Sequence, residues 1–264
     1  MVREADQRAR LRLDGGLATA KHAATLLATV GVMLRYGPGK GLPIASLYAA
    51  IGDDRRATVI ANQLIEDGLA IETNAIADRV ALLDARLAPA LVALVRHGEP
   101  TETAQRALGY IANAERPTAG QVRAFLGVPP KTWPNPADEA LAELQRLALI
   151  DRGPTAVPAT GAAYLGKDGI PYRIFDRAHP SVAKAAAKLT RASAAVILLD
   201  RYLAGALFGT RRKLASMFGL AKPVLDAAIE ALVATDRATV DKQLVISGSG
   251  STATDRSSRT RRGS

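Results

Sequence analysis

Apolar residues recur at helical spacing along most of the chain, and three short segments repeat one arrangement. Each segment has an apolar residue five positions before a Gly, small residues in between and a bulky apolar residue just before that Gly. A helix that ends in Gly and is soon followed by another helix is typical of a helix-turn-helix. The pattern therefore predicts three such turns. The segments are residues 47–52, 122–127 and 214–219.

The first predicted unit spans residues 13–84 and contains three helices followed by a two-stranded hairpin. Gly and Pro after residue 36 end the first helix, Gly52 makes the turn, and Gly68 ends the third helix. Alternating apolar and polar residues then predict two short strands. The expected helices are 17–36, 43–51 and 54–67, and the expected strands are 69–73 and 79–83.

The same order recurs in a second unit, residues 85–179, and a third, residues 180–246. In the second unit, Asp168-Gly169 predicts the turn of a longer hairpin between 164–165 and 170–175. Residues 247–264 are rich in Ser, Gly and Arg, so we expect a disordered basic tail. A short linker helix, 88–96, is expected before the helices of the second unit. The expected helices of the two units are 103–114, 118–126, 135–149, 181–207, 211–218 and 223–234, and 239–246 is the terminal strand.

Three helices followed by a hairpin resemble the winged-helix DNA-binding superfamily. The resemblance covers about 230 residues and rests on the order of the elements and on three Gly turns. It implies a mainly α fold with small β hairpins, built as three tandem winged-helix-like units with a disordered basic tail.

The net charge of +10 is concentrated in the last third of the chain. Residues 181–264 hold 14 Lys and Arg against 6 Asp and Glu, whereas 1–100 and 101–180 are each at +1. A basic excess of this kind predicts a polyanion partner, and we expect double-stranded DNA.

The third helix of the first unit carries the side chains best suited to reading bases. Ala57, Ile60 and Leu64 cluster on its inner face. Its outer side carries groups that pair with guanine and adenine or contact a thymine methyl, and the resemblance places this helix in the major groove. The candidate base-reading residues are Arg55, Arg56, Thr58, Val59 and Asn62.

Glu139 and Glu143 lie on the outer face of the corresponding helix in the second unit, where phosphates would repel them. We expect this unit to act as a spacer or to bind a protein partner. Trp133, between prolines, would cover the apolar core or anchor that partner.

Candidate phosphate contacts gather in the third unit and the tail. Arg211, Arg212 and Lys213 stand at a helix start, where cations oppose the helix dipole unless an anion binds beside them. The candidate phosphate-binding residues are Arg211, Arg212, Lys213, Lys222, Arg237, Lys242, Arg256, Arg259, Arg261 and Arg262.

The residues for catalysis or metal binding are sparse. The chain has no Cys, and its three His, at positions 22, 97 and 179, lack the spacing of metal ligands. We therefore expect no catalytic residues, no metal and no cofactor.

Tandem winged helices also resemble a family of bacterial DNA glycosylases that excise alkylated or crosslinked bases. Those enzymes carry a Gln-x-Gln or Gln-x-Asp motif, which no Gln of this chain completes. We therefore expect a non-enzymatic DNA-binding protein, either a transcriptional regulator or a plasmid or phage replication initiator. The alternative is a protein-interaction subunit of a chromosome-organising complex.

Residues 1–14 lack the apolar core of a signal peptide, and no run approaches the roughly 20 apolar residues of a membrane span. We expect a cytoplasmic, nucleoid-associated protein with no membrane contact. The oligomeric state stays open.

Overall fold

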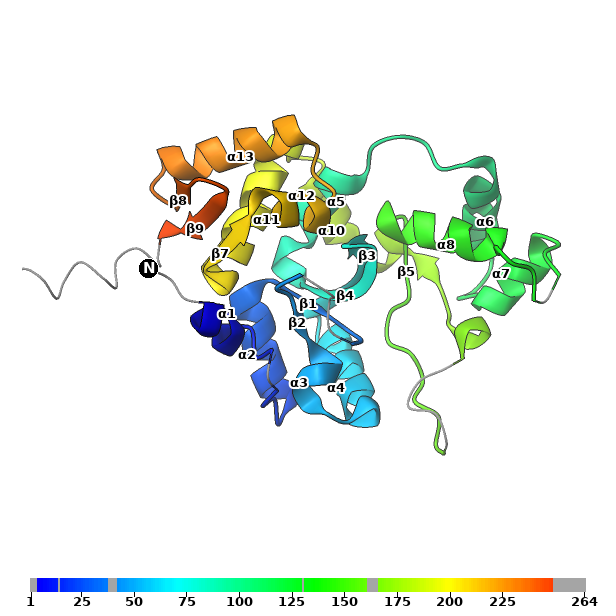
Figure 1. Cartoon of the computed structure of the whole chain (residues 1–264). Helices are drawn as coiled ribbons and strands as arrows, with labels where there is room; N and C mark the ends of the chain where they lie inside the picture. Colours follow the sequence, from blue (N-terminus) through cyan, green and yellow to red (C-terminus); the bar gives the residue numbers. More distant parts are fainter. Residues whose placement is uncertain (1–3, 14, 38–41, 130, 161–165, 249–264) are drawn as a thin grey trace, which may run out of the picture.

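Helices dominate the computed structural model, and three small sheets are set among them (Figure 1). The mainly α fold class predicted from the sequence is confirmed. The structure describes residues 4–13, 15–37, 42–129, 131–160 and 166–248. The predicted disordered tail begins two residues too early, because Ser247 ends a strand and Gly248 donates a hydrogen bond to the Arg237 carbonyl. The rest of the predicted tail, 249–264, lies outside the described residues. No helix in the described ranges is long and apolar enough to cross a membrane.

The first part of the chain combines four helices with a four-stranded sheet. The strand order is β2-β1-β4-β3, with β1 parallel to β2 and antiparallel to β4, and β3 and β4 form the predicted hairpin. The elements are α1 (Glu4–Arg10), α2 (Ala20–Val30), β1 (Val32–Leu34), β2 (Ala45–Ser46), α3 (Leu47–Ile51), α4 (Asp54–Glu66), β3 (Ala70–Ile76) and β4 (Arg79–Asp84).

The helix predicted over residues 17–36 is too long, because α2 ends at Val30 and the chain continues as β1. Gly31 adopts a left-handed φ of 78° and closes the helix. A Cβ at this position would lie 2.6 Å from Arg201 Cγ and 2.8 Å from Leu87 Cδ1. The helix therefore stops where the backbone packs directly against two later segments.

The second part has a small apolar core of its own. The second part begins after η1 (Ala85–Leu87) and α5 (Ala88–Val95), whose apolar side chains pack in the larger core. Its elements are α6 (Glu102–Asn113), α7 (Ala119–Phe125), α8 (Pro136–Arg146), β5 (Ile150–Asp151), η2 (Lys167–Gly169) and β6 (Arg173–Ile174).

The long hairpin predicted in this part is not formed as expected. Residues 173–174 pair with β5, where Ile150 faces Ile174, and Asp168-Gly169 lie in the turn η2. The other predicted strand, 164–165, lies outside the described residues. Pairing with β5 brings the Ile174 side chain of β6 onto the core of this part.

The third part has four helices and the sheet β7-β9-β8, after the short helix α9. The helix predicted over 181–207 is divided, and Thr190 caps the second segment by accepting a hydrogen bond from the Ser193 N–H. The elements are α9 (Phe175–Ala178), α10 (Pro180–Ala186), α11 (Arg191–Ala206), β7 (Phe208–Thr210), α12 (Arg211–Phe218), α13 (Lys222–Ala234), β8 (Ala238–Asp241) and β9 (Leu244–Ser247).

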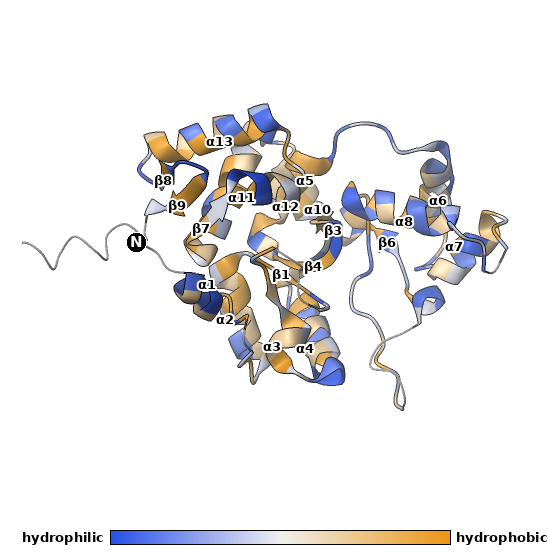
Figure 2. Cartoon of the chain, viewed as in Figure 1, coloured by the Kyte–Doolittle hydropathy of each residue, from blue (hydrophilic) through white to orange (hydrophobic). Residues whose placement is uncertain are grey.

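The first and third parts share one continuous apolar core. Helix α11 packs against α2, α5 and α13, and apolar segments line these contacts (Figure 2). The approach of α11 to α2 is close, because a Cβ on Gly205 would lie 2.5 Å from Val30 Cα. The second part meets this body beside the Arg96–Asp176 ion pair, in which Arg96 Nη2 lies 2.6 Å from Asp176 Oδ1.

The three Gly turns that the sequence predicts are confirmed. Gly52, Gly127 and Gly219 have φ values of 74°, 71° and 61°, in the left-handed region that Gly adopts without strain. A helix follows each turn.

Candidate nucleic-acid interface

Helix α4 forms as the sequence predicts, with its polar face directed away from the large core. The Asp53 side chain caps it by accepting a hydrogen bond from the Arg56 N–H at 2.7 Å. Ala57, Ile60 and Leu64 are buried in the core. The remaining question is what the polar face contacts.

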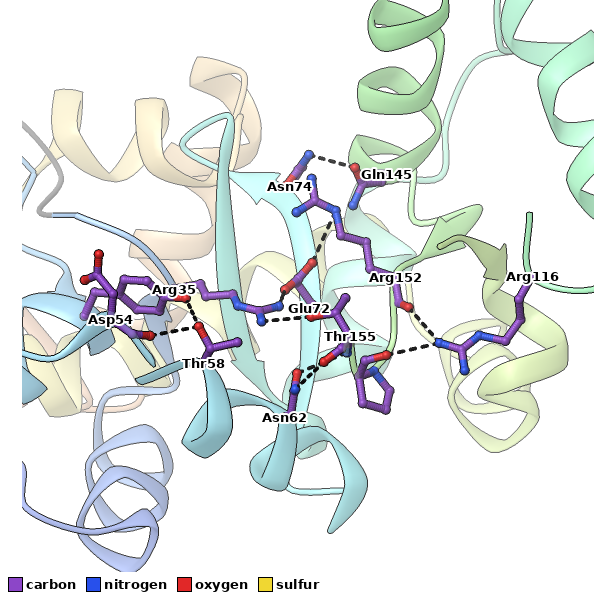
Figure 3. Close-up of polar contacts among 12 residues, drawn as sticks. Arg35, Asp54, Thr58, Asn62, Glu72, Asn74, Arg116, Gln145, Arg152 and Thr155 are labelled. Carbon is purple, nitrogen blue, oxygen red and sulfur yellow. Dashed lines mark hydrogen bonds and ion pairs between the residues drawn. The ribbon is translucent and has the colours of Figure 1, made fainter. Parts of the chain in front are cut away.

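A segment of the second part, residues 153–160, lies along this polar face, and Figure 3 shows its Thr155 beside Asn62. We call residues 153–160 the strap. Asn62 makes two hydrogen bonds to the backbone of Thr155, donating to its carbonyl at 2.5 Å and accepting from its N–H at 3.1 Å. Arg55 donates to the carbonyls of Pro158 and Ala159. In this conformation the strap covers two of the predicted base-reading side chains.

The other three predicted base-reading residues have different surroundings. Thr58 is fully buried and hydrogen-bonded to the Tyr48 hydroxyl. Arg56 is exposed and donates to the Ala18 carbonyl. Val59 is half exposed. Base reading by these five residues therefore remains a prediction, and in this conformation only Arg56 and Val59 are turned toward solvent.

A buried ionic cluster lies behind the strap, where the first and second parts meet. Glu72 pairs with Arg35, and its other oxygen lies 3.4 Å from Arg152 Nε. Arg35 also donates to Thr155 Oγ1 at 3.3 Å, which links the cluster to the strap. Burial by itself would lower the pKa of Arg35, but the Glu72 carboxylate raises it above the ordinary value. Arg35 therefore stays charged, and the cluster connects the first and second parts of the chain.

The predicted phosphate-binding residues of the third part are spread over several elements. Arg211 Nη1 and Lys222 Nζ share the carboxylate of Asp226, at 2.5 and 3.1 Å, and Arg237 pairs with Asp200. Their charge is therefore partly compensated within the protein. Arg212 and Lys242 are exposed, and Lys213 is half buried. The tail residues Arg256, Arg259, Arg261 and Arg262 lie outside the described residues.

Trp133 does not cover the apolar core, because 90% of its surface is exposed. It lies in the loop between α7 and α8. Docking of a protein partner on this loop remains a prediction.

The structure brings together a charged group that the sequence reading missed. The buried carboxylate of Asp151 lies 2.6 Å from Arg173 Nε and 2.6 Å from His179 Nε2. Burial alone would raise the pKa of Asp151, but the hydrogen bonds from His179 and Arg173 lower it below the ordinary value. The group joins β5 to β6 and to the start of α10. Sequence spacing gave no signal for it, because its members stand 22 and 28 positions apart.

Helix α1 was also missed by the sequence reading. Gln7 and Leu11 are buried four positions apart, and this spacing is the signal that could have predicted the helix. Gln7 donates to the carbonyls of Ala206 and Phe208, both at 2.7 Å, and so fixes α1 on the third part.

Among the described residues, no three His, Asp or Glu side chains cluster so as to hold a metal ion.

No protein-family model matches the chain, and no curated protein matches it. One solved structure with a similar fold is the Streptomyces sahachiroi DNA glycosylase AlkZ. The match covers 88% of this chain and 64% of that structure, with a TM-score of 0.55 and 12% sequence identity. The chain thus spans less than two thirds of the AlkZ structure.

This match overturns two expectations drawn from the sequence. A non-enzymatic regulator or replication initiator was expected, and an enzyme was not, yet the fold found is that of a DNA glycosylase. Nothing in the match supports a role in transcription or replication. The inference was wrong because it rested on a short catalytic motif, whereas the likeness lies in the arrangement of the elements over most of the chain.

Proposed function

We propose that this chain is a DNA glycosylase, an enzyme that removes a base from double-stranded DNA. The observation that carries the proposal is the shared fold, which extends over 88% of the chain. The basic excess of the chain agrees with it, because a net charge of +10 favours a polyanionic substrate.

The reaction is hydrolysis of the bond between the sugar C1′ and the base. A water oxygen forms the new bond to C1′, the bonding electron pair leaves with the base, and the proton of the water passes to the base or to solvent. An alkylated base with a positive charge leaves as a neutral molecule, so its departure requires little help from an acid. The resemblance of this chain to glycosylases that excise alkylated bases therefore makes these bases the first substrate class to test.

The absence of Gln-x-Gln and Gln-x-Asp from the sequence separates this chain from the pattern of that family. If the chain is a glycosylase, its water must be oriented by other groups. For this reason the proposal names no catalytic residue, and the test measures the reaction itself.

The experiment incubates the protein with duplex DNA treated with a methylating agent. Free base is measured by chromatography, and abasic sites are measured by strand cleavage after alkali. We expect released base and alkali-labile sites in treated DNA and neither in untreated DNA. Binding of treated duplex with no base released from any methylated position would overturn the proposal.

A further inference from the structure

A hollow of about 330 Å³ lies between α1, the segment before α3 and the start of α12. Three cations line it, Arg8, Arg12 and Lys213, against one carboxylate, Glu4. Cationic side chains therefore outnumber carboxylates in the lining of the hollow. Like charges that converge on one hollow repel one another, and an anion between them relieves the repulsion.

The geometry of α1 explains why these side chains line one hollow. Glu4 and Arg8 are spaced four positions apart, which places them on one side of α1, and Arg12 lies in the turn that follows the helix. Gln7 and Leu11 are buried and hold α1 in place. Arg8 is thus presented by a helix that is fixed on the third part, and Arg12 by the turn directly after that helix.

Lys213 approaches the hollow from α12. Its backbone N–H is capped by Thr210 Oγ1 at 3.2 Å, and its side chain lines the hollow. Arg211, two positions earlier, is paired with Asp226 instead. Of the basic cluster 211–213, Lys213 is therefore the member that lines this hollow.

A second hollow, of about 670 Å³, shares Arg12 with the first. Arg10 and His22 also line it, and Arg10 adds a second guanidinium along the same stretch of surface. Two adjoining hollows with a shared arginine suit a chain of phosphates better than a single small anion.

We propose that the hollow between α1 and α12 binds a phosphodiester of the DNA backbone through Arg8, Arg12 and Lys213. This inference rests on the proposed DNA substrate and adds a backbone site to it. Contacts of this kind position a duplex without reading its sequence. The second hollow holds the next part of the backbone.

The test measures affinity for a fluorescent duplex by anisotropy over a series of salt concentrations. The variant carries Arg8→Gln, Arg12→Gln and Lys213→Gln. Each lost phosphate contact lowers the slope of log affinity against log salt by about 0.9. We expect the slope of the variant to fall by about one to two, because the first hollow binds one phosphodiester and Arg12 also lines the hollow that holds the next part of the backbone. Affinity should be roughly tenfold weaker at moderate salt.

The matched control removes three exposed cations elsewhere, with Arg106→Gln, Lys184→Gln and Lys188→Gln. Thermal melting checks that both triple variants are folded. We expect the control to keep the slope of the parent protein. Equal slopes for the two triple variants would overturn the proposed site.

Glu4→Gln supplies a test in the opposite direction. Removing the carboxylate from the hollow should tighten DNA binding severalfold, and unchanged or weaker binding would count against the site. Inorganic phosphate serves as a competitor that distinguishes a free anion from a backbone. Binding of inorganic phosphate to the parent protein but not to the triple variant, with equal DNA affinity for the two proteins, would overturn a backbone site.

The two proposals fail in different ways. If the parent protein binds no duplex, the proposed function fails. If it binds and releases base while the hollow variant keeps its salt slope, only the phosphate site fails.

Discussion

The side-chain amide of Asn62 is matched to the backbone of Thr155, donating to its carbonyl and accepting from its N–H. The two residues stand 93 positions apart and lie in the first and second parts of the chain. The pair fastens the strap to α4. In this conformation the Asn62 side chain therefore makes a structural contact with the Thr155 backbone.

Asn62→Ala should lower the free energy of unfolding by about 1–3 kcal/mol, because the Thr155 N–H and carbonyl lose their partner in a half-buried place. Urea denaturation measures the change. Gln63→Ala, on the exposed side of the same helix, is the control and should alter stability by less than about 0.5 kcal/mol. DNA affinity of the folded Asn62→Ala protein then tests base reading, since an unchanged affinity would remove Asn62 from the candidates.

Glu72→Ala should be more damaging, at about 3–5 kcal/mol, because it leaves Arg35 and Arg152 buried without their carboxylate. The loss should appear as a lower midpoint of chemical denaturation. Glu66→Ala, exposed at the end of α4, removes a carboxylate without uncovering a buried charge. Equal stability losses for the two variants would contradict the buried cluster.

Asp151 predicts a pH dependence of stability. Its folded pKa lies below the unfolded value of about 3.9, so its contribution is present above that value and is lost as pH falls through the folded pKa. The difference in unfolding free energy between the parent and Asp151→Asn should be largest above about pH 4 and shrink in more acidic solution. Denaturation curves at a series of pH values measure it. A stability difference that grows as the pH falls would contradict the expected direction of this pH dependence.

Trp133 is the chain's one tryptophan and reports directly on the loop between α7 and α8. Because 90% of it is exposed, its fluorescence should resemble that of tryptophan in water and be quenched readily by iodide. Trp133→Ala should change stability by less than about 0.5 kcal/mol. Blue-shifted, protected emission would instead indicate that the residue covers a core or an interface.

The helices around the three turns could be predicted because their signals are local. Gly52 and Gly219 end helices through their own backbone conformation, and apolar spacing marks the inner face of α4. The end of α2 could not be predicted as easily, because Gly31 packs on Arg201, far along the chain.

The candidate site was harder to predict for a physical reason. Arg and Asn donate to base edges and to backbone carbonyls with the same groups, so the pattern of Arg55 and Asn62 fits both partners. The choice between them depends on the strap, whose position over α4 has no signal within either segment. The hollow beside α12 similarly needs α1, which arrives from the other end of the chain.

The Arg96–Asp176 ion pair marks the place where the chain leaves the large core and later returns to it. Residues between these two positions therefore form an insertion, which adds Ala148 and Phe175 to the apolar core of that body and otherwise packs on a small core of its own. Replacing the insertion with a short linker should leave that body folded. Truncating the chain between α4 and α11 should not, because either fragment would lack part of the shared core. The separately packed unit of this molecule is therefore the middle of the chain, and the two ends of the chain share one core.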